Sequence, residues 1–399
     1  MALAVLATAF LFNLLGRGSA ETYAVFLLPM EREMGWTRSQ ITGVYSVYML
    51  VGGFVAPLVG TLFDRLGPRL VYFTGLAMLA AANLLASRLT SLAEFHLYIG
   101  VMVGIGVALV GMVPASGLLV RWYPTHLSRA ISIAFAAAGC GALLFVPLTQ
   151  SLLDEIGWRQ TYQLIGIGLA ILAPALALAL PWRTYSAGHA EYRKHRDSGE
   201  GARRWTLASA TRVPAYWGMA TIYAFTSIGM FTVVPQLVAY LIDIGYSPLV
   251  AASAYGAIGV LSVVSITSTG FFAERLGYRQ TLTGSFVVSI TGIGLLLLMT
   301  LSAPGWLLPL FVGIFGLAMG TRGPIVSAIC AKKFSGNRVA TIYGTIYALN
   351  AIGCAIGAIL GGALHDWTGD YRAGFTVGIV SLIIAAMPMW VVRELREFR

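Results

Sequence analysis

Twelve long apolar segments dominate this sequence and limit what the chain can fold into. Each approaches or exceeds about 20 residues, the length that an α-helix needs to cross the hydrocarbon core of a bilayer. Because backbone groups in lipid must find their hydrogen-bond partners within the segment, such runs predict membrane-spanning α-helices. We expect the twelve spans at residues 3–30, 41–63, 70–87, 94–120, 130–153, 161–181, 214–241, 249–273, 281–301, 306–331, 340–364 and 371–392.

The composition excludes most other classes of protein. Charged residues make up only 11% of the 399 residues and hydrophobic residues 58%, whereas an average soluble domain has about 25% charged residues. A water-soluble enzyme and a disordered chain are therefore excluded. The three cysteines lack metal-ligand spacing and no nucleotide-binding loop is found, so we expect no metal, no cofactor and no enzymatic activity.

The positions of lysine and arginine predict the orientation in the membrane. Of the 26 such residues, nineteen lie in connections on the side of the basic central segment 182–212, and five lie on the opposite side. Since basic loops stay in the cytoplasm, we expect both termini and the central segment there. The net charge of +10 is then a topology signal and does not indicate nucleic-acid binding. The short termini favour a bacterial inner-membrane protein, and we expect a monomer.

The two halves of the sequence repeat each other at an offset of 210 residues. Residues 60–69 match residues 270–279, and matched glycines and prolines follow at the same offset in later spans. This duplication predicts an all-α membrane protein of two six-helix bundles, residues 1–181 and 213–399, joined by the cytoplasmic loop 182–212. Transporters built from such repeats bind their substrate near the middle of the membrane.

The repeated loop resembles the signature loop of the major facilitator superfamily. It reads Gly-x-x-x-Asp-Arg-x-Gly-x-Arg at residues 60–69 and recurs with Glu in place of Asp at residues 270–279. Within this superfamily the chain is most similar to the monocarboxylate and oxalate/formate transporters, through residues 121–124, 128–134, 138–141 and 157–159. The resemblance implies proton-coupled secondary transport of a small organic anion, in particular a monocarboxylate, by alternating access.

Two other functions stay open at this point. An exporter of amphipathic or drug-like compounds would have the same fold, and so would a membrane sensor that no longer transports. The carboxylate transporters carry an arginine in span eight, but residues 262–269 contain no cation here. A carboxylate would therefore have to bind to charged groups elsewhere.

Three charged residues, Arg17, Glu21 and Arg322, fall well inside the predicted spans. Charged groups are expensive in hydrocarbon and usually functional. We expect Arg322 to bind a substrate carboxylate through two parallel hydrogen bonds. Arg17, Glu21 and Asn13 are spaced by four residues and share a helix face, which the resemblance directs to the central cavity. Arg17 would supply a second positive charge and Glu21 would carry the coupling proton, although a purely structural Arg17–Glu21 ion pair is the alternative.

Polar residues near the middle of two further spans are candidates to line the substrate pocket. Gln236 follows a proline in span seven, and Tyr347 and Asn350 lie in span eleven. Such residues also serve as hydrogen-bonding contacts between helices, which is the alternative interpretation.

The resemblance assigns a gating role to both copies of the signature loop. Asp64 and Glu274 would each face a helix N-terminus or a basic neighbour, and so hold the cytoplasmic gate shut. A plain solvated turn is the alternative. The predicted gating residues are Gly60, Asp64, Arg65, Gly67, Arg69, Gly270, Glu274, Arg275, Gly277 and Arg279.

Overall fold

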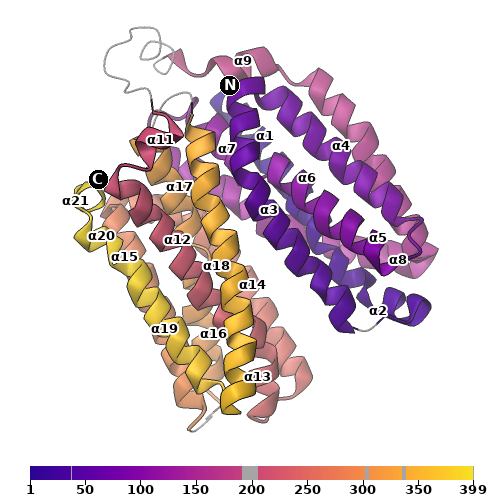
Figure 1. Cartoon of the computed structure of the whole chain (residues 1–399), viewed down its shortest axis with the longest axis vertical. Coiled ribbons are helices and arrows are strands. Elements are labelled where there is room, and N and C mark those ends of the chain that lie inside the picture. The colour runs from indigo at the N-terminus through magenta and orange to yellow at the C-terminus, as the bar shows by residue number, and fades with distance from the viewer. Residues whose placement is uncertain (37, 191–204, 302–304, 335–337, 399) are drawn as a thin grey trace. The chain divides into compact units, whose positions relative to one another are not determined.

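The computed structural model describes residues 1–36, 38–190, 205–301, 305–334 and 338–398 (Figure 1). Every regular element in these ranges is a helix. Eleven of the helical segments are long and apolar enough to cross a membrane, and the longest, Leu127–Ala179, holds two spans because Gly157 interrupts it with a φ of 77°. The predicted all-α fold with twelve spans is confirmed.

The chain divides into two compact units. Unit 1 comprises Met1–Leu207 and Ala331–Ala348, and unit 2 comprises Ala208–Cys330 and Leu349–Arg399. The predicted domain bounds 1–181, 182–212 and 213–399 stay a prediction. Residues 191–204 of the predicted central loop lie outside the described residues.

Unit 1 is organised around its longest helix. Both α1 and α4 pack against α8, while α3 and α4 pack against α6. The helices that begin in this unit are α1 (Ala2–Glu21), α2 (Tyr23–Met34), α3 (Arg38–Leu66), α4 (Pro68–Ala86), α5 (Leu92–Phe95), the π-helix η1 (His96–Met102), α6 (Val103–Val110), α7 (Met112–Leu119), α8 (Leu127–Ala179), α9 (Trp182–Ala187) and α11 (Leu207–Ala210).

Unit 2 repeats this kind of packing with different helices. The pair α12 and α19 lies side by side, and α16 packs between α14 and α15. The helices that follow in the chain, of which α17 and α18 each cross a unit boundary, are α12 (Pro214–Val233), the 3₁₀ turn η2 (Val234–Gln236), α13 (Leu237–Asp243), α14 (Pro248–Leu276), α15 (Tyr278–Met299), α16 (Leu307–Ala318), α17 (Arg322–Lys333), α18 (Val339–Thr368), α19 (Arg372–Ala386), α20 (Pro388–Val391) and α21 (Arg393–Arg396).

Five of the predicted spans are interrupted, a feature that apolar length alone does not predict. The span predicted at 3–30 breaks at Thr22, and the helix after the break runs to Met34, beyond the predicted end of the span. The span predicted at 214–241 contains the 3₁₀ turn around Pro235. The spans predicted at 94–120 and 306–331 each break near the middle, and the span predicted at 371–392 breaks at Met387. An apolar run therefore predicts a crossing but not whether its helix is continuous.

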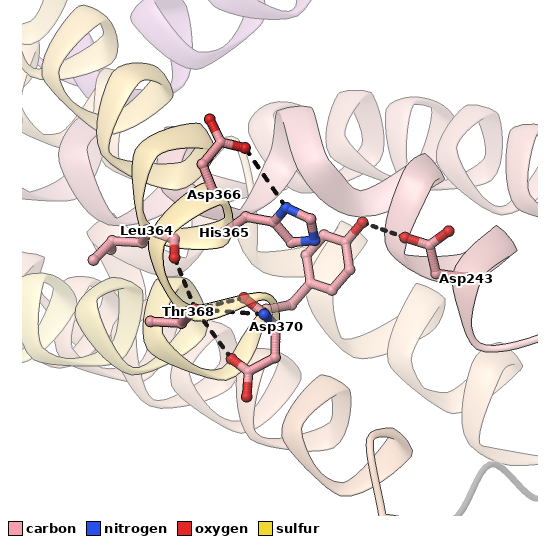
Figure 2. Close-up of polar contacts among 7 residues, drawn as sticks. Asp243, Leu364, His365, Asp366, Thr368 and Asp370 are labelled. Carbon is pink, nitrogen blue, oxygen red and sulfur yellow. Dashed lines mark hydrogen bonds and ion pairs between the residues drawn. The ribbon is translucent and has the colours of Figure 1, made fainter.

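In both halves of the sequence, a carboxylate that follows the first span accepts hydrogen bonds from residues that precede the sixth span. In unit 1 Glu33, near the end of α2, accepts hydrogen bonds from Trp158 and Arg159, which directly follow the break in α8. Both hydrogen bonds lower the pKa of the Glu33 carboxyl below its ordinary value, and the bond from Arg159 has the larger effect. In unit 2 Asp243, the last residue of α13, accepts a hydrogen bond of 2.5 Å from Tyr371, directly before α19 (Figure 2).

Candidate substrate and proton site

Arg17 lies in α1, and its charge is balanced within unit 1. Its Nη2 forms an ion pair of 2.8 Å with Oε1 of Glu21, one turn further along the same helix. Its Nη1 donates a hydrogen bond of 2.6 Å to the hydroxyl of Tyr48 on α3. The Arg17 and Glu21 side chains keep 30% and 23% of their exposure. The ion pair is therefore only partly buried. Protonation of Glu21 would break the ion pair and leave Arg17 with the hydrogen bond to Tyr48.

Tyrosine side chains surround this ion pair. The Tyr45 ring contacts the rings of Tyr23 and Tyr48, with centroid distances of 4.9 and 5.5 Å. Tyr347, in the part of α18 that belongs to unit 1, interacts electrostatically with Arg17. The structure thus brings three of the predicted residues, Arg17, Glu21 and Tyr347, into one cluster.

Three other predicted pocket residues lie elsewhere. Asn13 is 1% exposed and donates a hydrogen bond of 2.8 Å to the Ala9 carbonyl of its own helix. Asn350 donates a hydrogen bond of 2.6 Å to Oγ of Ser227, which joins α18 to α12 inside unit 2. Gln236 is half-buried in the 3₁₀ turn between α12 and α13. In this structure the side-chain amides of Asn13 and Asn350 serve helix structure and helix packing.

Arg322 is the first residue of α17, and its side chain is directed at α15. Only 2% of the residue is exposed. Its Nη2 donates hydrogen bonds to the Ser285 carbonyl, at 2.7 Å, and to Oγ of Ser289, at 2.5 Å. The guanidinium carbon lies 4.7 Å from the centroid of the Phe286 ring. In the part of the chain that the structure describes, Nε and Nη1 have no hydrogen-bond partner, and no carboxylate pairs with this cation.

The break in span ten places Arg322 at a helix start inside the apolar part of unit 2. Helix α16 ends at Ala318, and α17 begins three residues after Met319. A Cβ atom at Gly320 would overlap the Ile266 side chain of α14, so glycine is what lets the broken segment lie against that helix. The first N–H groups of a helix lack intrahelical acceptors and carry the positive end of its dipole. A buried cation at such a helix start favours an anion as ligand.

Span four of unit 1 is interrupted at the equivalent point. Helix α6 ends at Val110, Gly111 is extended with φ −84° and ψ −155°, and α7 begins at Met112. At the offset of 210 residues, Met112 corresponds to Arg322. Interrupted spans at corresponding positions of two repeats are the feature that best indicates the binding site of such a transporter. Of the two breaks, the one in unit 2 carries the charge.

Sequence reasoning missed the side chains that hold the two arginines. Ser285 and Ser289 are four residues apart in span nine and hence on one helix face, a signal that a search for paired polar residues would find. Tyr45 and Tyr48 are three apart in span two and form the same kind of pattern. Neither pattern shows by itself which cation the residues contact.

The first copy of the signature loop binds the start of α18 within unit 1. Oδ2 of Asp64 accepts hydrogen bonds from the Thr341 N–H, at 3.0 Å, and from the Thr341 hydroxyl, at 2.8 Å. A Cβ atom at Gly60 would overlap the Ala340 carbonyl, so only glycine allows this approach of α3 to α18. Gly67 turns the chain into α4 with a φ of 80°.

The second copy of the loop keeps the turn but has different contacts. Gly277 has a φ of 89° between α14 and α15, and the guanidinium of Arg279 stacks on the Trp390 ring at 4.7 Å. Gly270 is buried and Glu274 is half-buried. The other predicted gating residues, Arg65, Arg69 and Arg275, are exposed.

Twelve helical spans, two repeated halves and paired breaks in spans four and ten define a multi-pass membrane transporter. The chain belongs to the Major Facilitator Superfamily, whose family model matches residues 6–314 and 268–398. This confirms the resemblance to that superfamily. Its relatives and structural neighbours are transporters and not enzymes.

Individual proteins resemble the chain over almost its whole length. Monocarboxylate transporter 13 of Rattus norvegicus is 27% identical over 386 residues, which cover 94% of this chain and 84% of that protein. The crystal structure of the human organic anion transporter MFSD10 has a TM-score of 0.75 at 17% identity and covers 97% of this chain and 99% of that one. The proton:xylose symporter XylE has a TM-score of 0.74 at 15% identity, covering 98% and 95%. The two structures show the shared fold.

Proposed function

We propose that this chain carries a small monocarboxylate together with a proton by alternating access, with both termini in the cytoplasm of a bacterial cell. The observation that carries the proposal is the buried Arg322, whose Nε and Nη1 lack hydrogen-bond partners among the described residues. A cation in an apolar span without a counter-charge is costly unless a ligand neutralises it at some stage. The relatives named as monocarboxylate transporters support a carboxylate as that ligand.

The two arginines have separate roles in this proposal. Arg322 binds the substrate carboxylate, since a guanidinium matches the geometry of a carboxylate. Glu21 takes up the coupling proton, which dissolves its ion pair with Arg17 and leaves that cation to Tyr48 and Tyr347 or to substrate. One proton and one carboxylate carry no net charge across the membrane, so transport is electroneutral.

The remaining predicted residues complete this scheme. Gln236, Asn350 and Asn13 contribute polar groups to the substrate pathway when the helices around them rearrange. The signature loops act as the cytoplasmic gate, which Asp64 holds shut through its two hydrogen bonds to Thr341 at the start of α18.

Proton-coupled uptake by purified protein in liposomes tests the proposal. The vesicles contain a pH-sensitive dye, and pyruvate, L-lactate, oxalate, succinate and xylose are added outside under an inward proton gradient. We expect saturable acidification with a monocarboxylate and none with xylose. Protonated weak acids also cross bare lipid, so protein-free vesicles and vesicles with the Arg322→Gln variant run in parallel and define the background.

Two results would contradict the proposal. Acidification that is equal with wild-type protein, Arg322→Gln protein and bare lipid for every carboxylate would exclude proton-coupled carboxylate transport. Saturable efflux of amphipathic compounds by the same vesicles would then favour the exporter instead.

A further inference from the structure

The hydrogen bonds of Arg322 determine how a ligand can reach it. A guanidinium has five N–H donors and offers a carboxylate two forks. The end fork uses Nη1 with Nη2, and the side fork uses Nε with Nη2. Both forks therefore need Nη2, and in this structure Nη2 donates to the Ser285 carbonyl and to the Ser289 hydroxyl. Nε and Nη1, which have no hydrogen-bond partner among the described residues, lie on different edges of the guanidinium and cannot serve one carboxylate in parallel.

The two acceptors on α15 differ in how easily they can be released. The Ser285 acceptor is a main-chain carbonyl, fixed by the helix, and the Ser285 hydroxyl is turned away to donate 2.7 Å to the Leu282 carbonyl. The Ser289 acceptor is a hydroxyl at the end of a side chain that rotates about a single bond. Ser289 is fully buried, so no solvent replaces its contact to Nη2. The Ser289 hydroxyl is therefore the group that a ligand oxygen can displace.

Phe286 packs beside the guanidinium of Arg322. Its ring centroid lies 4.7 Å from the guanidinium carbon, and the residue is itself 1% exposed. The N–H groups of a guanidinium point outward in its own plane. A carboxylate that bonds to Nη2 must therefore approach in that plane, where it meets the Ser289 hydroxyl as its competitor.

We propose that Ser289 is a positioning residue which holds Arg322 in a resting position on α15, and that the substrate carboxylate takes the place of the Ser289 hydroxyl on Nη2. The inference rests on the proposed function, because it assumes that Arg322 binds the substrate. Ser289 then sets the apparent affinity: its hydrogen bond has to be broken each time a carboxylate binds with two parallel bonds. Ser285 has no such part, since its contribution comes from the main chain.

Three variants separate this role from a structural one. Ser289→Ala removes the competing hydroxyl, Ser289→Thr keeps it, and Ser285→Ala is the matched control because it keeps the carbonyl that Arg322 contacts. Uptake of radiolabelled pyruvate and L-lactate is measured for each variant in liposomes. We expect Ser289→Ala to lower KM about three- to tenfold with kcat within about threefold, the effect of losing one hydrogen bond. Ser289→Thr and Ser285→Ala should keep the wild-type KM.

A second measurement does not depend on knowing the substrate. Phenylglyoxal condenses with both Nη atoms of an arginine and so reports whether the end fork is free. Modification of Arg322, followed by mass spectrometry of the protein in nanodiscs, should be several times faster in Ser289→Ala than in wild type, Ser289→Thr or Ser285→Ala.

The outcomes distinguish this inference from the proposed function. An unchanged or raised KM in Ser289→Ala, or equal modification rates in all variants, would overturn the role of Ser289 even if Arg322→Gln is inactive. Wild-type uptake by Arg322→Gln would instead overturn the proposed function of Arg322, and the inference with it.

Discussion

The two halves of this transporter share a scaffold but carry the charged residues of their spans on different helices. Both interrupt the fourth of their six spans at the same point, before Met112 in unit 1 and before Arg322 in unit 2. Unit 1 has its cation in its first span instead, where Arg17 is paired with Glu21. The position equivalent to Arg17 in unit 2 is Ser227, which accepts a hydrogen bond from Asn350.

This difference separates what duplication preserved from what diverged. Helix breaks and turn glycines recur in both halves because they depend on backbone geometry, and a carboxylate contact between the first and the sixth span recurs as well. The charges do not recur, and each half balances its cation differently: one by a carboxylate, the other by a serine hydroxyl and a main-chain carbonyl. An ion pair that can be protonated suits proton coupling, whereas an arginine without a carboxylate partner suits an anionic substrate.

The most direct test of this difference is to give the two interruptions the same residue. Arg322→Met gives unit 2 the residue that unit 1 has at position 112. We expect carboxylate uptake to fall at least about 100-fold, since a buried charge–ligand contact is lost. The melting temperature should stay equal or rise, because an apolar side chain replaces a buried, unpaired charge. Arg88→Gln, which removes an exposed arginine, is the control and should keep uptake within about twofold.

A second variant tests the ion pair of unit 1. Glu21→Gln keeps the size of the side chain but cannot exchange a proton, so we expect uptake to become independent of the proton gradient and to fall about tenfold. Uptake with and without the gradient measures this. Glu155→Gln, an exposed carboxylate on α8, should keep the dependence. If Glu21→Gln protein still responds fully to the gradient, the pair with Arg17 is structural.

The two copies of the signature loop allow a third comparison. Asp64→Asn weakens the two hydrogen bonds from Thr341, so we expect kcat to change about three- to tenfold with little change in KM. Glu274→Gln in the second copy should have a smaller effect. Initial rates over a range of pyruvate concentrations give both constants. A change in KM alone for Asp64→Asn would place this residue in substrate binding and not in gating.

The smallest expected effect concerns the contact of Glu33 with Trp158 and Arg159 in unit 1. Hydrogen bonds from Arg159 and Trp158 lower the pKa of Glu33, so the folded protein keeps this carboxylate charged to lower pH than the unfolded chain does. The contact therefore stabilises the fold above the ordinary pKa of glutamate, and this contribution disappears as the pH falls through the lowered pKa. Since Glu33 is about half exposed, Glu33→Gln should lower the melting temperature only slightly at neutral pH and not at all in acid. A difference that grows in acid would contradict this.

Several features of the molecule followed from the sequence alone. Apolar length predicted the twelve spans, because a helix must be long enough to cross the bilayer whatever its neighbours are. The offset of 210 residues predicted two repeated halves, and the loop at residues 60–69 identified the superfamily. The spacing of Arg17 and Glu21 predicted their contact, since residues four apart meet on a helix surface.

Tertiary structure decided what the charged groups touch. The sequence placed Arg322 in span ten, but packing against α15 determined that Nη2 is occupied while Nε and Nη1 stay free among the described residues. The breaks beside Gly111 and Gly320 also depend on packing, since hydropathy is the same for a continuous and a broken helix. The physical reason is the distance along the sequence between the groups that interact. Crossing a membrane and pairing along one helix depend on residues that are close in sequence. The partner of a buried side chain comes from another helix, which no local sequence pattern identifies.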